Sequence, residues 1–224
     1  MNRGKYTKIL FGLLTLLVIV LAITEIRSVM DATNVMSNEP ETANTIEIGP
    51  YTLPVTESKF LNSLYDNINN NLEGSNNEII GSVAQAFVAD FFTLRDKSNF
   101  DDVGGLGFVF QPVRNQFRDN AIASYYLDLY QFRSAFGQEN LPLVTEVTVG
   151  DIENLNLTSV SINDSDTITV HAVKEANVTW TYEDNDVVDT TNIINQARIR
   201  FVQDQETRHW FVYSINQPQF NQWW

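Results

Sequence analysis

His171 and His209 are the side chains of this sequence best suited to acid–base chemistry near neutral pH. They are its only histidines, and an imidazole has an ordinary pKa of about 6.5. Successive residues of a strand face opposite sides of a sheet. His171 then falls opposite the apolar residues of its segment, whereas His209 shares a side with Phe211 and Tyr213. The pattern favours surface or packing positions for both imidazoles over a shared catalytic site.

Carboxylates gather at Glu183, Asp184, Asp186 and Asp189. This run resembles a fragment of a calcium-binding loop, because calcium prefers oxygen ligands. The run lacks the glycine that such a loop has at its sixth position and the glutamate at its twelfth. Counted from Asp184, the twelfth residue is Asn195. A turn with hydrated carboxylates is therefore the better interpretation.

Other cofactor chemistry has little support in the sequence. The chain has no cysteine, which excludes thiol nucleophiles, disulfides and cysteine-containing zinc sites. Two histidines without i, i+4 spacing supply too few donors for a metal ion. Gly104, Gly105 and Gly107 follow no predicted strand, so they indicate a tight turn and not a nucleotide-binding loop. We therefore predict no catalytic residue, no cofactor and no metal.

Aromatic residues are better candidates for recognition. Tyr125, Tyr126 and Tyr130 crowd one predicted helix together with two phenylalanines and cover more than one of its faces. Burial in the core is the leading interpretation, and the alternative is a groove or interface, where tyrosine is enriched. The chain ends in Trp223 and Trp224, a pair that is unfavourable in water. This pair either folds back onto its own domain or docks on a partner or membrane surface.

The charge of the chain is strongly negative and unevenly distributed. The formal net charge is −14, and from residue 28 onward 10 basic residues stand against 27 acidic ones. Binding to nucleic acid depends on lysine and arginine replacing the counterions of the phosphates. We therefore expect no nucleic-acid partner. Such acidity also keeps an exported domain soluble.

Residues 9–24 are predicted to form a transmembrane helix. The run 9–23 contains no charged residue, and Arg3, Lys5 and Lys8 precede it. At about 1.5 Å per residue it spans roughly 22 Å, and Lys8 extends its reach by placing its ammonium among the headgroups. Positive residues before an apolar run hold that end in the cytoplasm. We expect a cytoplasmic N-terminus at residues 1–8 and a single-pass signal anchor in the plasma membrane.

A cleaved signal peptide is the alternative interpretation, because its apolar region has a similar length. A cleavage site needs small residues, and Ala22-Ile23-Thr24 matches that pattern only weakly. We favour the anchor. Both interpretations place the remainder of the chain outside the cytoplasm.

A tether and one domain must position the candidate residues. Residues 25–55 are rich in Asn, Thr, Glu and Ser and contain Pro40, Pro50 and Pro54, which predicts a tether with one short extended piece at 46–51. With 43% apolar residues and 12% aromatic residues, the rest has enough bulk for a core. We place a domain at 56–216 and an aromatic tail at 217–224.

The period of the apolar residues predicts helices first and strands afterwards. Apolar residues recur at three- and four-residue steps over 60–72, 80–94 and 122–136, and Pro112 is expected to begin a short helix between the last two. After Leu141 the period changes to two. The longest alternation covers 167–182, with Lys174 on its apolar side at a predicted bend or bulge. This order indicates an α+β fold with helices packed on one face of a curved, cone-like antiparallel sheet.

The order of elements over residues 56–216 resembles the nuclear-transport-factor-2-like superfamily, in which helices cross a strongly bent antiparallel sheet to form a cone. The preceding anchor and tether make the whole chain look like the membrane-anchored bridging components of type IV secretion and conjugation systems. The superfamily resemblance implies that an enzyme of this kind would place a His and an Asp inside the cone. The predicted helix at 56–72 is an addition to the superfamily's opening helix.

Two functions are compatible with these observations. The first, which we favour, is a non-enzymatic extracytoplasmic interaction or assembly module of a cell-envelope complex. The second is a small-molecule-binding or enzymatic domain that uses the cone. An enzyme needs a pocket with convergent titratable groups, whereas an assembly module presents a filled cone and an exposed apolar patch. The expected partners are the lipid bilayer, through residues 9–24, and envelope proteins, and self-association stays open.

Overall fold

The computed structural model describes residues 44–162, 166–217 and 222–223. These residues form helices and antiparallel sheets, which confirms the predicted α+β class. The expected cytoplasmic N-terminus 1–8, the membrane segment 9–24 and Trp224 lie outside the described residues. Within the described part, no helix combines the length and the apolar character needed to cross a bilayer.

The domain begins earlier than the sequence analysis predicted. β1 (Thr45–Ile48) and β2 (Tyr51–Pro54) form an antiparallel hairpin around Gly49, in the predicted tether 25–55, where the sequence indicates only a short extended piece at 46–51. The side chains of Tyr51 and Leu53 are buried, and the Tyr51 hydroxyl donates a hydrogen bond of 2.6 Å to the carbonyl of Trp210. Each strand is too short to show a clear period, and therefore its membership of the core depends on contacts with distant residues.

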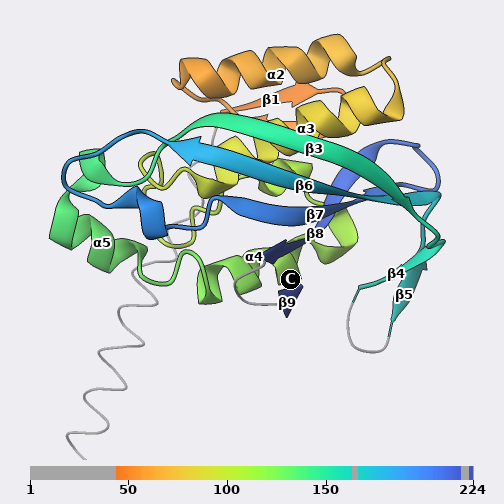
Figure 1. Cartoon of the computed structure of the whole chain (residues 1–224). Coiled ribbons are helices and arrows are strands. Elements are labelled where there is room, and N and C mark those ends of the chain that lie inside the picture. Colours follow the sequence, from red (N-terminus) through yellow and green to blue (C-terminus); the bar gives the residue numbers. More distant parts are fainter. Residues whose placement is uncertain (1–43, 163–165, 218–221, 224) are drawn as a thin grey trace, which may run out of the picture. The chain divides into compact units, whose positions relative to one another are not determined.

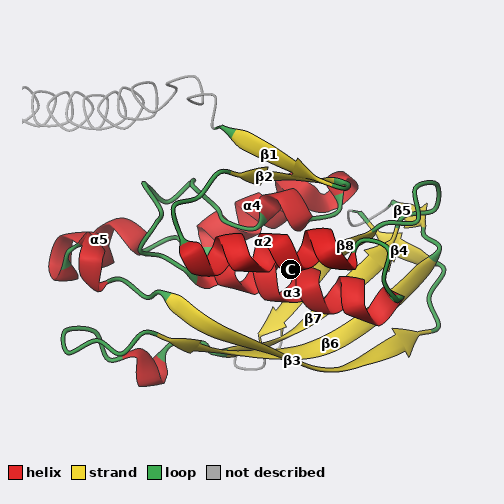
Figure 2. Ribbon diagram, turned by 90° about the horizontal axis from the view of Figure 1, so that it is seen from above, coloured by secondary structure: helices red, strands yellow, loops and turns green. Residues whose placement is uncertain are grey.

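The first two helices match the prediction. α2 (Lys59–Asn71) begins after Ser58, whose side chain accepts a hydrogen bond from the amide of Leu61. α3 (Asn76–Phe92) begins with a capping box formed by Ser75 and Glu78, which satisfies amides that have no partner within the helix. α3 is buried along most of its length because α2 packs on one side of it and the sheet on the other (Figure 2).

The third predicted helix is interrupted. α4 (Arg114–Ala123) follows two short 3-10 helices, Leu106–Phe108 and Gln111–Val113, and α5 (Leu129–Phe136) is a separate element. The rings of Tyr125 and Tyr126 lie between them and both contact Phe91, with centroid distances of 5.7 and 5.6 Å. Adjacent residues of a helix point about 100° apart. The break allows both rings to reach the core, which a continuous helix would not.

The main sheet is antiparallel, in the order β3-β6-β7-β8-β9. Its strands are β3 (Val144–Leu155), β6 (Ala172–Tyr182), β7 (Gln196–Gln203), β8 (Trp210–Gln217) and β9 (Gln222–Trp223). The small hairpin β4 (Ser159–Ser161) and β5 (Thr167–Thr169) lies between β3 and β6 in the sequence. Figure 1 shows β4 and β5 at the opposite end of the sheet from α5.

The bulge predicted at Lys174 is absent from the register. β6 and β7 pair without interruption from Ala172 to Thr179, and the irregularities lie instead within the β3–β6 and β7–β8 pairs. Lys174 is tolerated on the apolar face because its ammonium reaches the carbonyl oxygen of the Asn77 side chain, at 2.6 Å. Its stem covers apolar surface while its charge stays at the end of the sheet.

Aromatic rings fill the space between α3 and the sheet. Phe92 stacks on Trp180 at a centroid distance of 4.0 Å, and Phe87 stacks on Phe91 at 5.4 Å. Phe87, Phe91 and Phe92 have no solvent-exposed surface. The middle of the helix–sheet layer is therefore a packed core.

We predict that Phe91→Ala lowers the free energy of unfolding by about 3–5 kcal/mol, because it leaves a cavity among packed rings. The control is Phe132→Ala, the same chemical change at a side chain that is 45% exposed, for which we expect a loss below about 1 kcal/mol. Urea denaturation of both variants measures the difference. An equally small loss of stability in both variants would show that the apolar residues of α3 do not form the main core.

Candidate functional site

An apolar groove of about 590 Å³ opens at the end of the domain where α5 faces the loop between β6 and β7. In Figure 2 this is the end at which α5 lies apart from the other helices. The wall on the α5 side consists of Ser124, Tyr125, Asp128, Phe132 and Phe136. The opposite wall consists of Val187, Val188, Asp189, Ile193 and Ile194, and Leu94, Leu141 and Pro142 complete the lining. Carbon-rich side chains therefore make up most of the surface.

Two tyrosines stiffen the groove where it meets the core. The hydroxyl of Tyr125 donates to the carbonyl of Phe92 at 3.1 Å, and that of Tyr182 donates to the carbonyl of Ile194 at 2.8 Å. Burial raises the pKa of Tyr125 well above its ordinary value and the pKa of Tyr182 to about 12. Both hydroxyls therefore stay protonated near neutral pH, and they act as fixed donors to the backbone.

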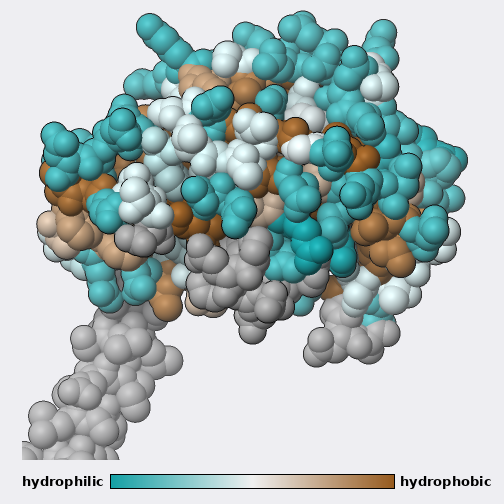
Figure 3. Space-filling model, viewed as in Figure 1, coloured by the Kyte–Doolittle hydropathy of each residue, from teal (hydrophilic) through white to brown (hydrophobic). Residues whose placement is uncertain are grey.

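The rim of the groove carries apolar side chains in contact with solvent. Phe132 is 45% exposed and Val187 is 54% exposed, one on each wall. On α5 and just before it, Tyr130 is 76% and Leu127 is 61% exposed. Figure 3 shows apolar surface at this end of the molecule, bordered by hydrophilic side chains. Exposed apolar surface that gathers in a hollow, instead of being scattered, is a feature that interaction sites share.

The charges around the groove are mainly negative. The loop 183–195 contributes Glu183, Asp184, Asp186 and Asp189 and no basic residue, and α5 is preceded by Asp128. Two arginines lie nearby, and both are engaged. Arg95 forms an ion pair of 2.5 Å with Glu183, and Arg133 donates a hydrogen bond to the carbonyl of Ser98.

α5 is held in place by few contacts. It has eight residues, and Leu129 is its only buried one. A helix this short is not stable by itself in water. The side chain of Arg133 donates to the carbonyl of Ser98, and just after the helix the Gln138 side chain donates to the carbonyls of Arg95 and Lys97. The wall of the groove is therefore the least supported helix of the described domain.

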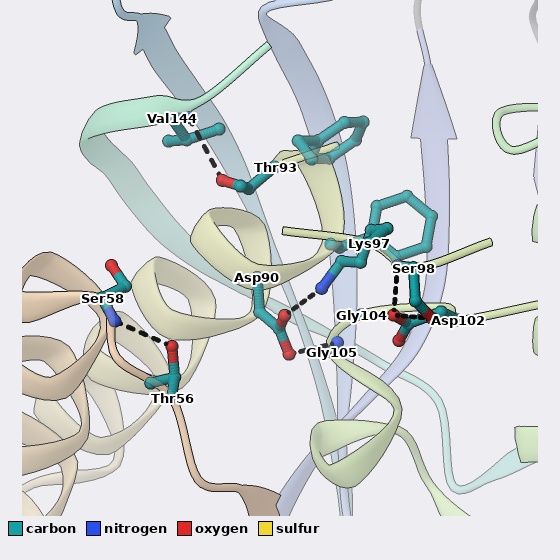
Figure 4. A network of polar contacts seen from close by, with 12 residues as sticks. Thr56, Ser58, Asp90, Thr93, Lys97, Ser98, Asp102, Gly104, Gly105 and Val144 are labelled. Carbon is teal, nitrogen blue, oxygen red and sulfur yellow. Dashed lines mark hydrogen bonds and ion pairs between the residues drawn. The ribbon is translucent and has the colours of Figure 1, made fainter. Parts of the chain in front are cut away.

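A buried ion pair positions the chain that leads into this wall. Lys97 lies 2.6 Å from one carboxylate oxygen of Asp90, and the amide of Gly105 donates to the other oxygen at 2.7 Å. Figure 4 shows Lys97 and Gly105 meeting Asp90 from two sides. Burial is the largest single influence and lowers the pKa of Lys97, but the charge and hydrogen bond of Asp90, together with Tyr126 and Asp102, raise that pKa above its ordinary value. Both oxygens of the Asp90 carboxylate thus have a partner, and the pair connects α3 to the loop 97–105.

Glycine is required where this loop meets α3. A Cβ atom at Gly104 would lie 2.3 Å from the carbonyl oxygen of Asp90, and Gly105 has a φ of +72°. The amide of Gly104 then donates to the hydroxyl of Tyr126 at 3.1 Å, and that hydroxyl donates to the carbonyl of Phe91 at 2.6 Å. The tight turn predicted from the glycines is confirmed. Its role is to lock Tyr126, just before α5, against the core.

The structure separates the predicted recognition residues. Tyr126 is buried, Tyr125 lines the groove and Tyr130 is exposed on α5. Trp223 lies in β9, whose backbone pairs with Asn216 of β8, and Trp224 lies outside the described residues. The apolar pairs Val187-Val188 and Ile193-Ile194 on the opposite wall were not identified from the sequence. They lie next to short polar stretches in which apolar residues do not recur at a regular spacing. Their apolar character inside an acidic loop was therefore the only feature of the sequence that could have identified them.

The two histidines lie at the other end of the sheet. The amide of His171 donates to the carbonyl of Gln203, and the carbonyl of His209 accepts from the amide of Asp204. They therefore flank the end of β7, His171 just before β6 and His209 just before β8. Both side chains are exposed. They occupy one end of the sheet, but neither lines the groove.

The acidic run is organised by its own turn. The side-chain oxygen of Asn185 accepts from the amides of Val187 and Val188, and Asp189 accepts from the amide of Thr191, at the start of a short 3-10 helix. Among the described residues, no three acidic or histidine side chains are grouped to hold a metal ion. The run shapes the loop that forms one wall of the groove.

Comparisons with known proteins give no relative for this chain: no protein-family model, no curated protein and no solved structure matches it. The geometry of the groove and the composition of the chain therefore carry the functional argument.

We predict that Lys97→Met lowers the free energy of unfolding by about 3–5 kcal/mol, because it leaves the buried Asp90 carboxylate without its cation. Arg118→Met is the control. It removes an exposed arginine that pairs with Asp119 at 3.0 Å, and we expect a loss below about 1 kcal/mol. Chemical denaturation compares the two variants. A similar small loss in both would mean that the pair at Asp90 does not support the fold.

Proposed function

We propose that this protein is a membrane-anchored, extracytoplasmic interaction module of a cell-envelope complex and that the groove beside α5 is where it holds its partner. The observation that carries the proposal is the contrast between two regions. The space between α3 and the sheet is filled with buried rings, whereas the groove at the end of the domain is open and lined by exposed Phe132 and Val187. An open apolar surface on a well-packed scaffold is suited to binding.

The chemistry of the groove supports recognition over catalysis. Its titratable lining residues are Asp128, Asp189 and Tyr125. The Tyr125 hydroxyl donates to a backbone carbonyl and its pKa is raised, which makes it a poor base near neutral pH. Asp189 holds the amide and hydroxyl of Thr191. The described groove thus has no pair of side chains arranged as nucleophile and base.

A small-molecule-binding domain is the second candidate, and the volume of the groove favours it. Pockets for small ligands commonly measure about 300–1,000 Å³, and this groove has about 590 Å³. Its open rim and its exposed aromatic side chains fit a protein segment better, because a small ligand is usually enclosed on most sides.

The membrane anchor and the family resemblance belong to the same proposal. The basic residues before the apolar run 9–24 support a cytoplasmic N-terminus and an outer domain. Helices over one face of an antiparallel sheet are consistent with the cone of the nuclear-transport-factor-2-like superfamily. An anchored domain of this kind is similar to the bridging components of type IV secretion and conjugation systems.

The location can be tested with a topology reporter fused after Trp224. We expect a reporter that works only outside the cytoplasm to be active and a reporter that works only inside to be silent, because the positive flank precedes the apolar run. Full-length chain that stays in the membrane after a carbonate wash would identify the segment as an anchor. Activity of the cytoplasmic reporter would contradict the proposed location.

The binding role can be tested by placing a photo-crosslinking amino acid at Val187 in the full chain in its native cell. We expect adducts with a defined envelope protein, identified by mass spectrometry. The matched control carries the same amino acid at Thr181, which is exposed on β6. Adducts at Val187 no stronger than those at Thr181 would contradict the groove as the binding surface.

Crosslinking at Val187 in a histidine variant distinguishes an interaction module from an enzyme. A His171→Gln/His209→Gln double variant keeps hydrogen-bonding side chains of similar size at the two histidine positions. We expect it to keep the crosslink at Val187 and the cellular function, since neither histidine lines the groove. A double variant that folds normally and loses function would overturn the non-enzymatic proposal.

A further inference from the structure

We infer that the occupant of the groove is a basic amphipathic segment of a partner protein, with apolar side chains that enter the groove and Lys or Arg side chains that face its rim. The inference rests on the proposed function, because it names the partner of the same site. It is carried by two independent features of the groove, its apolar lining and the sign of the charge around it.

The apolar lining determines which side chains of a partner can enter the groove. Phe132 and Phe136 are stacked one turn apart on the α5 wall, with ring centroids 6.4 Å apart and nearly parallel planes. Val187, Val188, Ile193 and Ile194 face them from the opposite wall. A groove with these walls can take up branched or aromatic side chains. Both the entering side chains and the walls of the groove then lose contact with water. Residues spaced by three or four positions on one helix face reach such a groove together.

The charges at the rim of the groove determine which partner residues can lie beside those apolar side chains. Asp128 and Asp189 belong to the lining, and Glu183, Asp184 and Asp186 precede Asp189 in the same loop. The nearby cations are engaged within the domain: Arg95 pairs with Glu183, and Arg133 bonds to the carbonyl of Ser98. The rim therefore has an excess of negative charge. Such a rim attracts Lys and Arg side chains and disfavours an acidic segment.

The same charges argue against a second copy of this chain as the occupant. From residue 28 onward the sequence has 10 basic and 27 acidic residues, and a groove that meets its own copy brings two negative rims together. Like charges in contact oppose association. A partner of opposite charge removes this repulsion and adds favourable contacts at the rim.

The weak support of α5 gives the binding event a measurable signature. An eight-residue helix with one buried residue is expected to open more readily than α3. Side chains that fill the groove cover Phe132 and Phe136 and thereby stabilise the helix that carries them. The amides of α5 should exchange their hydrogens more slowly when the groove is occupied.

The test uses the full chain in nanodiscs of zwitterionic lipid and two fluorescent 14-residue peptides. In the first peptide, Leu residues lie on one helix face and Lys residues on the other; in the second, every Lys is replaced by Glu. Fluorescence anisotropy gives the two affinities, and empty nanodiscs give the background from lipid. We expect the Lys peptide to bind at least about tenfold more tightly, and only this peptide to slow hydrogen exchange in α5.

Matched triple variants locate the charge effect. The rim variant is Asp128→Asn/Asp184→Asn/Asp186→Asn, which leaves the hydrogen bonds of Asp189 to Thr191 in place. The control variant is Asp66→Asn/Glu73→Gln/Asp151→Asn, at exposed positions outside the groove lining, with the same change in net charge. We expect the rim variant to lose about tenfold in affinity for the Lys peptide and the control variant to lose less than about twofold.

Three outcomes would overturn the inference. The first is equal binding of the two peptides, and the second is an equal loss of affinity in both triple variants. The third is a dimer, detected by sedimentation, that Phe132→Asp dissociates and that the Lys peptide does not displace. Crosslinking at Val187 distinguishes this failure from failure of the proposed function. If Val187 crosslinks to a defined envelope protein but the domain does not prefer the Lys peptide, the proposed function is supported and only the inference about a basic partner is contradicted.

Discussion

The buried ion pair between Asp90 and Lys97 is the constraint on which the end of the domain that carries the groove depends. α3 is surrounded by apolar contacts, and a carboxylate in that position is tolerated only when its oxygens have partners. Lys97 and the amide of Gly105 supply them at 2.6 and 2.7 Å. Satisfying the carboxylate brings the backbone of the loop onto α3, so closely that residue 104 has to be glycine.

The consequences of that contact extend to the groove. The same loop offers the amide of Gly104 to the hydroxyl of Tyr126, which also bonds to the carbonyl of Phe91. With Tyr126 held there and Tyr125 stacked on Phe91, the chain between α4 and α5 leaves the helical path. α5 then lies at the periphery with one buried residue. Its remaining apolar side chains form a wall that faces the β6–β7 loop, and the groove lies between them.

The domain thus combines a rigid body with one lightly held wall. Rings such as Phe92 and Trp180 fill the interior, and the exposed histidines lie at the opposite end of β6 and β7 from the groove. Recognition surfaces often occupy elements with little tertiary support, because such elements adapt to a partner at a low energetic cost. In the proposed function, the acidic rim adds selectivity by charge to an apolar surface that would otherwise bind many segments.

The sequence by itself determined the features that depend on neighbouring residues. The three- and four-residue steps identified α2 and α3, the change to a period of two placed the strands after Leu141, and the glycines at 104 and 105 identified the turn. Composition excluded cysteine chemistry, and the crowding of Tyr125, Tyr126 and Tyr130 indicated a core position or, as the alternative, a recognition surface. Each of these inferences uses information that lies within a few residues.

The tertiary structure decided the features that join distant residues. The hairpin 45–54 belongs to the domain because Tyr51 reaches Trp210, and the predicted helix 122–136 is broken because two tyrosines meet Phe91. The groove pairs α5 with a loop more than 50 residues later in the chain, so no local pattern indicated that Val187 and Ile194 face Phe132. Periodicity reports which side of one element is apolar. Which element covers that side, and whether a hollow remains between them, follows only from packing in three dimensions.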